Sequence, residues 1–395
     1  MDLSKIKKLG DLEVGGKRVL VRVDFNVPLK DGVITDDTRI RAALPTIENL
    51  IGRGARVVLM SHLGRPKGKP EAKYSLEPVA ARLAELLASG EIALSDSCVG
   101  DGARRVVLDL RDGQVAMLEN LRFHAGEEKN DDKLAKELAS LGDVYVNDAF
   151  GTAHRAHAST AGVPALLHDK AAGFLMEKEV RCLGKLLGEV DKPYVAVLGG
   201  AKVSDKIGII ENLLSRVDSL VIGGAMANTF VAATGGSLGT SLVETDKLPL
   251  ARDLLGRAES KGVKILLPSD AVVASGPDST ETMVVPADKV PAGMAAFDVG
   301  PASRAKFREV IGRAGTILWN GPMGMFEKPQ FAEGTTAMAK AIAGASAFSV
   351  VGGGDSVAAV NQSGLEKGFD HISTGGGASL EMLEGKILPG IAALV

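Results

Sequence analysis

The stretch ValAlaValLeuGlyGlyAlaLysValSerAspLys, residues 195–206, sets the pattern for the second half of the chain. Its apolar run, Val195–Leu198, predicts a buried parallel strand. Two glycines follow, then Lys202, and then an amphipathic helix that carries Lys206. Backbone N–H groups and the helix dipole make such a strand–turn–helix corner receptive to phosphate. The stretch therefore predicts an α/β fold with a phosphate site beside a lysine.

The bulk composition agrees with this prediction. A chain of 395 residues exceeds one ordinary core, so we expect two domains. The hydrophobic share is 45% but the aromatic share only 4%, which indicates a core of Val, Ile, Leu and Ala, typical of strands buried on both faces. The net charge is only −3, which gives no indication of a protein that coats nucleic acid or a membrane surface. Any anion site must therefore be local.

The cysteines and the N-terminus indicate the compartment. Cys98 and Cys182 lie far apart and form no CxxC pair, so we expect neither a disulfide nor a zinc site. The N-terminal residues have no apolar core of a targeting peptide, and no apolar run approaches transmembrane length. These features predict a cytoplasmic protein.

The first half repeats one pattern of strand and helix. Helical periodicity is found at 38–51 and at 75–87, where Ser75 is the expected N-cap. These helices alternate with apolar segments that predict strands at 18–28, 55–66, 114–123 and 143–157. Such alternation predicts right-handed βαβ units and a parallel sheet.

Polar and basic residues follow all four strands of this half. In an open α/β sheet, ligands bind at the carboxyl ends of the strands. A single arginine in a loop is more often solvated, but the same feature at four strand ends favours a basin for a small polyanion such as a phosphorylated acid. The residues concerned are Asp24, Asn26, Arg39, His62, Arg65, Arg122 and Arg155, with His154 and His157 beside the last.

The second half differs, because its strands end in glycine or proline. A helix at 174–187 connects the halves, and residues 272–300 predict a β-rich excursion. Residues 371–384 predict a short strand, a glycine-rich hinge and a final helix. The strands of the second parallel sheet are predicted within 195–198, 219–227, 264–271, 316–327 and 347–356. The predicted fold is therefore two doubly wound, Rossmann-like domains joined by a helix and hinge, with a cleft between them.

A second glycine-rich corner, GlyGlyGlyAspSer at 352–356, offers bare amides for phosphate and a carboxylate for Mg²⁺. Alone it could be only a tight turn; paired with GlyGlyAlaLys it predicts a nucleoside triphosphate site. The P-loop, GxGxxG and HExxH patterns do not occur. The spacing of His154 and His157 fits one helix face, where a metal pair is possible but capping or anion binding is favoured.

Eight ordered motifs resemble those of the phosphoglycerate kinase family and span almost the whole chain. In the first half they are ValAspPheAsnValPro (23–28), SerHisLeuGlyArgPro (61–66), GluAsnLeuArgPhe (119–123) and AlaPheGlyThrAlaHisArgAlaHisAlaSer (149–159). In the second half they are GlyGlyAlaLysValSerAspLys (199–206), TrpAsnGlyProMetGlyMetPheGlu (319–327), ValGlyGlyGlyAspSer (351–356) and ThrGlyGlyGlyAlaSerLeuGlu (374–381).

The resemblance implies an activity and its ligands. It implies reversible phosphoryl transfer between 1,3-bisphosphoglycerate with ADP and 3-phosphoglycerate with ATP, in glycolysis and gluconeogenesis, by a monomer that closes by hinge bending. Its partners are these small molecules with Mg²⁺, and no nucleic acid or membrane. By the resemblance, 3-phosphoglycerate binds Asp24, Asn26, Arg39, His62, Arg65, Arg122 and Arg155. The nucleotide is placed on Lys202, Lys206, Glu327, Gly353, Gly354, Asp355 and Ser356.

Individual roles follow from the same resemblance. Glu327 would hold the ribose hydroxyls and Asp355 the Mg²⁺, while Arg39, Lys202 and Lys206 form the predicted catalytic set. One departure is Ala296, where many members have glycine, which predicts a slightly altered adenine pocket.

The reaction chemistry needs no general base. The acceptor is a carboxylate that is ionised at neutral pH, so His62 is interpreted as a substrate ligand and not as a base. The hypothesis is that Arg39 and Lys202 neutralise the transferring phosphoryl group, aided by glycine amides near 353 and 375, while Lys206 orients the nucleotide phosphates.

The expected domains are residues 1–173 with a returning segment 378–395 for phosphoglycerate, an interdomain helix 174–190, and 191–377 for Mg-nucleotide. A two-domain binding protein or a dehydrogenase would also explain the sheets. Neither would explain Lys202 and Asp355 together with an arginine basin, and a dehydrogenase should show GxGxxG.

Overall fold

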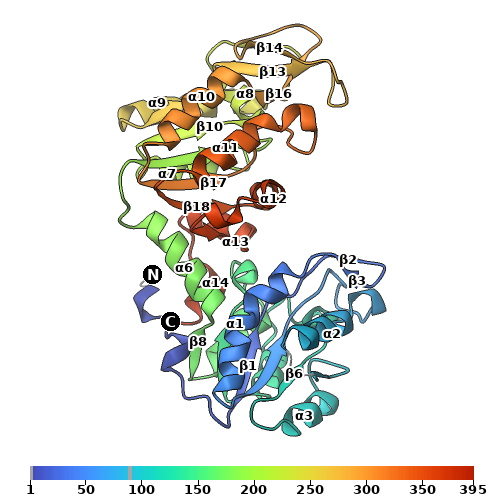
Figure 1. Cartoon of the computed structure of the whole chain (residues 1–395). Coiled ribbons are helices and arrows are strands. Elements are labelled where there is room, and N and C mark those ends of the chain that lie inside the picture. The colour runs from blue at the N-terminus through green and yellow to red at the C-terminus, as the bar shows by residue number, and fades with distance from the viewer. Residues whose placement is uncertain (1–2, 88–90) are drawn as a thin grey trace. The chain divides into compact units, whose positions relative to one another are not determined.

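The computed structural model describes residues 3–87 and 91–395 and divides the chain into two compact units (Figure 1). The first unit comprises residues 1–181 and 387–395, and the second comprises residues 182–386. The division falls within helix α6 (Phe174–Leu187). Residues 378–386 belong to the second unit, whereas the sequence-based bounds placed them in the returning segment.

The first unit is built on a six-stranded sheet whose recorded pairings are all parallel. Its strand order is β5-β6-β4-β1-β7-β8, so β1 and β4 lie at the centre. The strands are β1 (Arg18–Arg22), β4 (Arg56–Met60), β5 (Ala93–Leu94), β6 (Val115–Met117), β7 (Val144–Asn147) and β8 (Lys170–Ala172), and a small hairpin is formed by β2 (Leu29–Lys30) and β3 (Val33–Ile34). All four predicted strands are thus confirmed as neighbours in one sheet.

The helices of this unit connect the strands and cover the sheet. They are α1 (Thr38–Gly52), α2 (Glu77–Leu86), α3 (Asp101–Leu108), α4 (Asp132–Ala139), α5 (Val163–Leu166) and α14 (Pro389–Ala392). The C-terminal residues return to this unit, where the Gly390 N–H donates to the Ala153 carbonyl over 2.8 Å.

Helix α2 begins one residue later than predicted, because its N-cap is Leu76 and not Ser75. Pro78 is in the first turn, where its missing N–H costs nothing. The Ser75 hydroxyl still accepts from the Glu77 N–H over 3.2 Å while it donates to Glu119 over 2.7 Å.

The second unit is built on another six-stranded sheet whose recorded pairings are parallel, in the order β12-β10-β9-β17-β18-β19. Every residue of β9 and β17 is buried, as expected for strands covered on both faces. These strands are β9 (Tyr194–Leu198), β10 (Ser219–Ile222), β12 (Lys264–Leu266), β17 (Thr316–Asn320), β18 (Phe348–Gly352) and β19 (His371–Ile372). The predicted class of two doubly wound α/β domains is confirmed.

Helices cover this second sheet around a core that includes Trp319. Helices α10 and α11 pack against each other (Figure 1). Helices α7 and α13 are also in contact. The helices are α7 (Ile207–Leu213), α8 (Gly224–Ala233), α9 (Leu248–Ser260), α10 (Pro301–Ile311), α11 (Glu333–Ala343), α12 (Gly354–Ser363) and α13 (Gly377–Leu383).

The β-rich excursion forms an antiparallel sheet in the order β14-β13-β16 and a short parallel pair, β11-β15. The strands are β13 (Asp270–Ala274), β14 (Met283–Pro286), β15 (Lys289–Val290), β16 (Ala295–Val299) and β11 (Ser237–Leu238), the last of which lies outside the predicted range 272–300. The single strand predicted at 264–271 is wrong, because β12 ends at Leu266 and Asp270 already opens β13. Pro268 lies between them and has no N–H to donate to a ladder.

Three further elements differ from the prediction. A short strand, β8, precedes α6, although none was predicted there. Helix α7 begins only at Ile207, so Lys206 is its N-cap residue and Lys202 lies in an open turn before it. Helix α14 follows α13, which is therefore not the last helix. Among the described residues, no helix combines the length and apolar character that crossing a membrane requires.

Candidate functional site

The polar strand ends of the first unit gather at one edge of its sheet. Strands β6, β4, β1 and β7 are adjacent in that order, and the predicted substrate residues follow their carboxyl ends, except Arg39, which lies in α1. Because parallel strands end at the same edge, the topology brings together side chains that are separated by more than 100 residues in the chain.

Direct contacts link several of the predicted residues. Arg39 Nη1 donates to Asp24 Oδ2 over 2.8 Å, and the Gly64 N–H donates to Asn26 Oδ1 over the same distance. Arg122 Nη1 donates to the Gly64 carbonyl, also over 2.8 Å. One loop, 61–66, is therefore tied to its neighbours on both sides.

The arginines of this cluster differ in exposure. Arg122 is 6% exposed, and burial followed by the nearby charges of Arg155 and Arg22 lowers its pKa, although Glu128 at 3.1 Å opposes that change. Arg155 is half-buried, and Arg65 is exposed. The cluster is thus a concentration of positive charge that a bound anion would stabilise.

The histidines are buried within this positive charge. Burial and the charges of Arg22 and Arg122 lower the pKa of His62 well below its ordinary value and that of His157 to about 4. Both rings are therefore neutral at pH 7. The helix-face spacing proposed for His154 and His157 is wrong, because His154 lies in a turn and His157 precedes the π-helical turn Ala158–Gly162.

The glycine-ended strands β9, β17 and β18 are neighbours in the second sheet, which places their loops at one edge. Lys202 is exposed, whereas Lys206 is largely buried and its Nζ donates to Asn320 Oδ1. Burial lowers the pKa of Lys206, and the nearby carboxylates of Asp205 and Asp355 oppose that change.

The 353–356 loop forms the start of α12. Gly353 is its N-cap with φ of 92°, and a Cβ there would lie 2.9 Å from Asn320 Nδ2, so both conformation and space require glycine. Gly354 and Asp355 are exposed in the first turn. Ser356 is fully buried, and its hydroxyl accepts from the Gly321 N–H over 2.5 Å, so this side chain ties two loops together. Glu327 is exposed on the loop after β17.

Sequence reasoning missed residues that support these loops. Asn320 is fully buried, accepts from Lys206 and donates to the Gly352 carbonyl over 2.8 Å. Arg22, Glu127 and Ser159 form a buried polar chain behind His62. The signal for Arg22 was available, since a charged residue at the end of an otherwise apolar buried strand needs a specific partner.

The oxygen donors of the second unit suit Mg²⁺. Within residues 3–87 and 91–395, no three His, Cys, Asp or Glu side chains gather as a metal site. Mg²⁺ usually takes only one or two carboxylates and completes its shell with phosphate oxygens and water. Exposed Asp355, in the first turn beside the glycine loop, matches that donor set.

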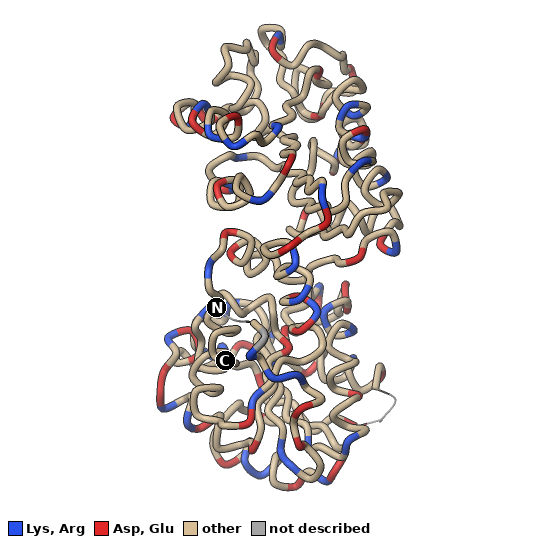
Figure 2. Tube along the Cα trace, turned by 90° about the vertical axis from the view of Figure 1, so that its left-hand side faces the viewer, with Lys and Arg blue, Asp and Glu red and all other residues tan. Residues whose placement is uncertain are grey.

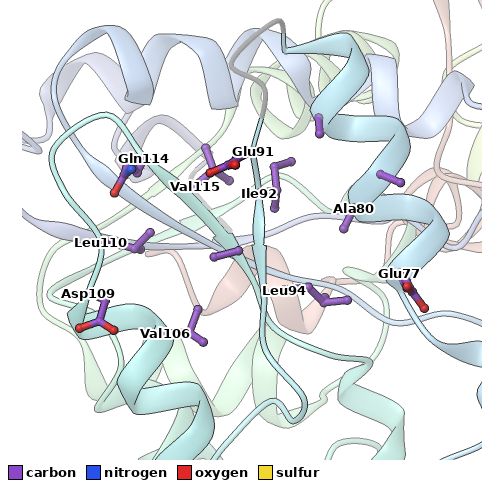
Figure 3. A pocket seen from close by; sticks show the side chains of 13 residues that line it. Glu77, Ala80, Glu91, Ile92, Leu94, Val106, Asp109, Leu110, Gln114 and Val115 are labelled. Atoms are coloured by element: carbon purple, nitrogen blue, oxygen red, sulfur yellow. The ribbon is translucent and has the colours of Figure 1, made fainter.

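Each unit also has a hollow, and that of the second unit reaches the loops that follow β10 and β17. A narrow pocket in the second unit is lined by Ala296, Phe297, Gly224 and Met323. An open groove in the first unit lies between α2, β5 and α3, where Ala80, Leu94 and Val106 point inward (Figure 3). The residues recorded as lining this groove include no Lys, Arg or His, so it does not suit a phosphate.

Two parallel-sheet α/β units with phosphate-compatible side chains at their strand ends define a class, the α/β proteins suited to phosphorylated ligands. The model of one family, phosphoglycerate kinase, matches residues 9–386, and the chain belongs to that family.

Relatives and solved structures of this family match the chain over nearly its full length. The phosphoglycerate kinase of Anaeromyxobacter dehalogenans (strain 2CP-1) is 57% identical over 392 residues, which is 98% of this chain and 99% of the relative. That of Pelotomaculum thermopropionicum is 55% identical over 390 residues, with the same coverage. The solved phosphoglycerate kinase structure from Coxiella burnetii is 45% identical with a TM-score of 0.91, and that from Pyrococcus horikoshii is 38% identical with a TM-score of 0.85. Each covers 98% of both chains.

Proposed function

We propose that this chain is a kinase that transfers a phosphoryl group reversibly between 1,3-bisphosphoglycerate with ADP and 3-phosphoglycerate with ATP. The observation that carries the proposal is the pairing, on one chain, of an arginine–histidine cluster with a glycine loop flanked by lysine and aspartate. Full-length similarity to phosphoglycerate kinases supports it.

The first unit would bind 3-phosphoglycerate. Arg122 and Arg155, with exposed Arg65, would hold the phosphate, because guanidinium groups form paired hydrogen bonds with its oxygens. Asp24 and Asn26 would accept and donate at the polar end of the substrate, and neutral His62 would donate one hydrogen bond.

The second unit would bind the nucleotide. Its phosphates would lie on the amides of Gly353, Gly354 and Ser356, with Lys202 and Lys206 supplying positive charge. Glu327 would accept from the ribose hydroxyls, and the pocket containing Ala296 would hold the adenine. Asp355 would hold Mg²⁺, which when bound neutralises phosphate charge.

The transfer would need no general base, since the acceptor carboxylate is already ionised. Arg39 and Lys202 would neutralise the equatorial oxygens of the transferring group, with help from glycine amides near 353 and 375. In-line transfer also requires that water be excluded, so we infer that hinge bending near 174–190 and 375–379 closes the units when both ligands are bound.

The type of partner, the oligomeric state and the cellular location belong to the same proposal. Basic and acidic residues are interspersed along both units (Figure 2), which suits small-molecule substrates better than nucleic acid or an anionic membrane. We infer a monomer that acts in the cytoplasm.

A coupled assay tests the function. The chain is mixed with ATP, Mg²⁺ and 3-phosphoglycerate, and an acyl-phosphate-consuming enzyme reports the product. The proposal predicts turnover that depends on all three reagents. Turnover that persists without 3-phosphoglycerate, or no turnover with a folded chain, would contradict it.

A further inference from the structure

A chain of buried polar groups lies behind the substrate cluster of the first unit. Arg22, the last residue of β1, is fully buried, and its Nε donates to Ser159 Oγ over 2.8 Å. The Ser159 hydroxyl donates to Glu127 Oε1 over 2.6 Å, and the Ser159 N–H donates to Glu127 Oε2 over 3.0 Å. Glu127 and Ser159 are fully buried too, so a carboxylate balances the guanidinium through one serine.

The other end of this chain contacts His62. Arg22 Nη2 lies 3.2 Å from His62 Nδ1, and Arg22 Nη1 donates to the Val23 carbonyl. A guanidinium has no acceptor, so Nδ1 must be the acceptor in this contact. In a neutral imidazole the remaining proton is then on Nε2.

The surroundings of His62 disfavour the imidazolium. Arg22, Arg122, Arg39 and His157 all act on the ring, and burial with these charges lowers its pKa well below the ordinary value. Within residues 3–87 and 91–395, no hydrogen bond of His62 Nε2 to another protein group is recorded. Nε2–H is therefore the donor that the ring can offer to a ligand.

We propose that Arg22, held by Ser159 and Glu127, is a positioning residue that fixes His62 as an Nε2–H donor to the anionic substrate; this role rests on the function proposed above. Arg22 is fully buried and each of its three guanidinium nitrogens has a partner inside the protein, so we assign its role to the ring of His62 and not to a substrate contact.

The assignment has a chemical consequence. With the proton on Nδ1, the ring would present the Nε2 lone pair to a phosphate or carboxylate oxygen, and two acceptors would face each other. Fixing the tautomer before binding removes that repulsive state and the cost of reorganising the ring.

The tautomer can be measured without substrate. Long-range ¹H–¹⁵N correlation spectra of the full chain, with His62→Gln used to assign the signal, should show the Nε2–H form of His62 throughout pH 6–8. An Nδ1–H form, or an imidazolium in this range, would overturn the proposal. This readout is independent of turnover, so a missing kinase activity would refute the proposed function and leave the tautomer assignment intact.

Variants separate positioning from simple structural support. Arg22→Met should convert His62 to a mixture of tautomers and raise the KM for 3-phosphoglycerate about twofold for an equal mixture, because only the Nε2–H form binds, with little change in kcat. Arg18→Met removes an arginine from the same strand, but one whose partner is Asp143, so it should change neither readout. A folded Arg22→Met protein with unchanged tautomer and KM would contradict the role.

Three other variants keep the test decisive if Arg22→Met fails to fold. Ser159→Ala removes only the bridging hydroxyl and should shift both readouts in the same direction. His62→Gln keeps an N–H donor near the Nε2 position, whereas His62→Asn keeps one near Nδ1. The Gln variant should retain the lower KM, and the reverse order would overturn the assignment.

Discussion

Arg39 combines a fixed position with an accessible guanidinium. It lies in the first turn of α1 and pairs with Asp24 over 2.8 Å, yet its side chain is 38% exposed. We predict that Arg39→Ala lowers kcat about a hundredfold or more, because arginine stabilises the charge of a transferring phosphoryl group. Affinity for Mg-ADP, measured by calorimetry, should remain unchanged. Arg41→Ala is the matched control, since Arg41 pairs with Asp37 on the same helix. An unchanged kcat in Arg39→Ala would refute its role.

His157 should make the protein sensitive to acid. Its pKa is lowered by burial to about 4 in the folded chain, against 6.5 when unfolded. Above pH 6.5 neither state binds the proton, but between 6.5 and 4 only the unfolded state does, so stability is lost as the pH falls through this window. His157→Gln should therefore show a shallower fall in melting temperature, by a few degrees, than the wild type. His168→Gln, at a highly exposed site, serves as control and should follow the wild type. Parallel curves for wild type and His157→Gln would contradict the prediction.

The residues of the candidate site were predictable to different degrees. Asp24, His62, Arg122 and Arg155 follow apolar runs, so local sequence indicated that they sit at strand ends. Ser159 bonds with Arg22 across 137 positions, and no local pattern encodes such a contact. The contacts of such supporting residues are determined by tertiary packing. Sequence reasoning can identify these residues only where a charged residue interrupts an apolar run.

Helix α6 depends on side chains of other elements at its start. Asp148 is fully buried and accepts from the Met176 N–H over 3.1 Å, while Thr46 Oγ1 accepts from the Phe174 N–H over 2.9 Å. We predict that Asp148→Ala lowers the free energy of unfolding of the first unit by about 1–2 kcal/mol, as loss of a helix cap does. Urea denaturation followed by far-UV circular dichroism measures this change.

Glu177→Ala is the control for this prediction. Glu177 lies in the first turn of the same helix but pairs with the exposed Lys8 over 3.3 Å. Its loss should cost less than about 0.5 kcal/mol. Equal effects of the two variants would show that Asp148 is not the cap.

At the level of elements, long apolar strands and periodic helices were predicted well, and short or interrupted elements were not. Strand β8 has three residues, two of them alanine, which carry no strand signal. Pro268 divides a run that the sequence pattern predicts as one strand. Its missing N–H rules out a continuous strand only where a neighbouring strand needs that hydrogen bond, and the sequence does not give the pairing. The late start of α7 likewise depends on Ser204, whose N–H and hydroxyl both donate to Glu244, 40 positions away.

At the scale of the whole molecule, the two units have separate cores and separate candidate sites. The only tryptophan, Trp319, is buried in the second core, so its fluorescence reports on that unit. Mg-ADP at 100 times its Kd should stabilise the second unit by about 2.7 kcal/mol and delay the fluorescence transition on heating. The same concentration of ADP with a chelator should delay it less. A transition that ignores Mg-ADP would contradict nucleotide binding beside Trp319.

The central claim is that this chain transfers phosphoryl from ATP to the carboxylate of 3-phosphoglycerate and not to water. Phosphorus NMR of the full chain with Mg-ATP and 3-phosphoglycerate tests it directly, because an acyl phosphate, a phosphate ester and inorganic phosphate give separate signals. The account predicts an acyl-phosphate signal that increases together with the signals of the ADP product. This signal should disappear when excess ADP is added, because the transfer then runs in reverse. A spectrum in which ATP is lost only to inorganic phosphate, or in which no signal changes, would contradict it.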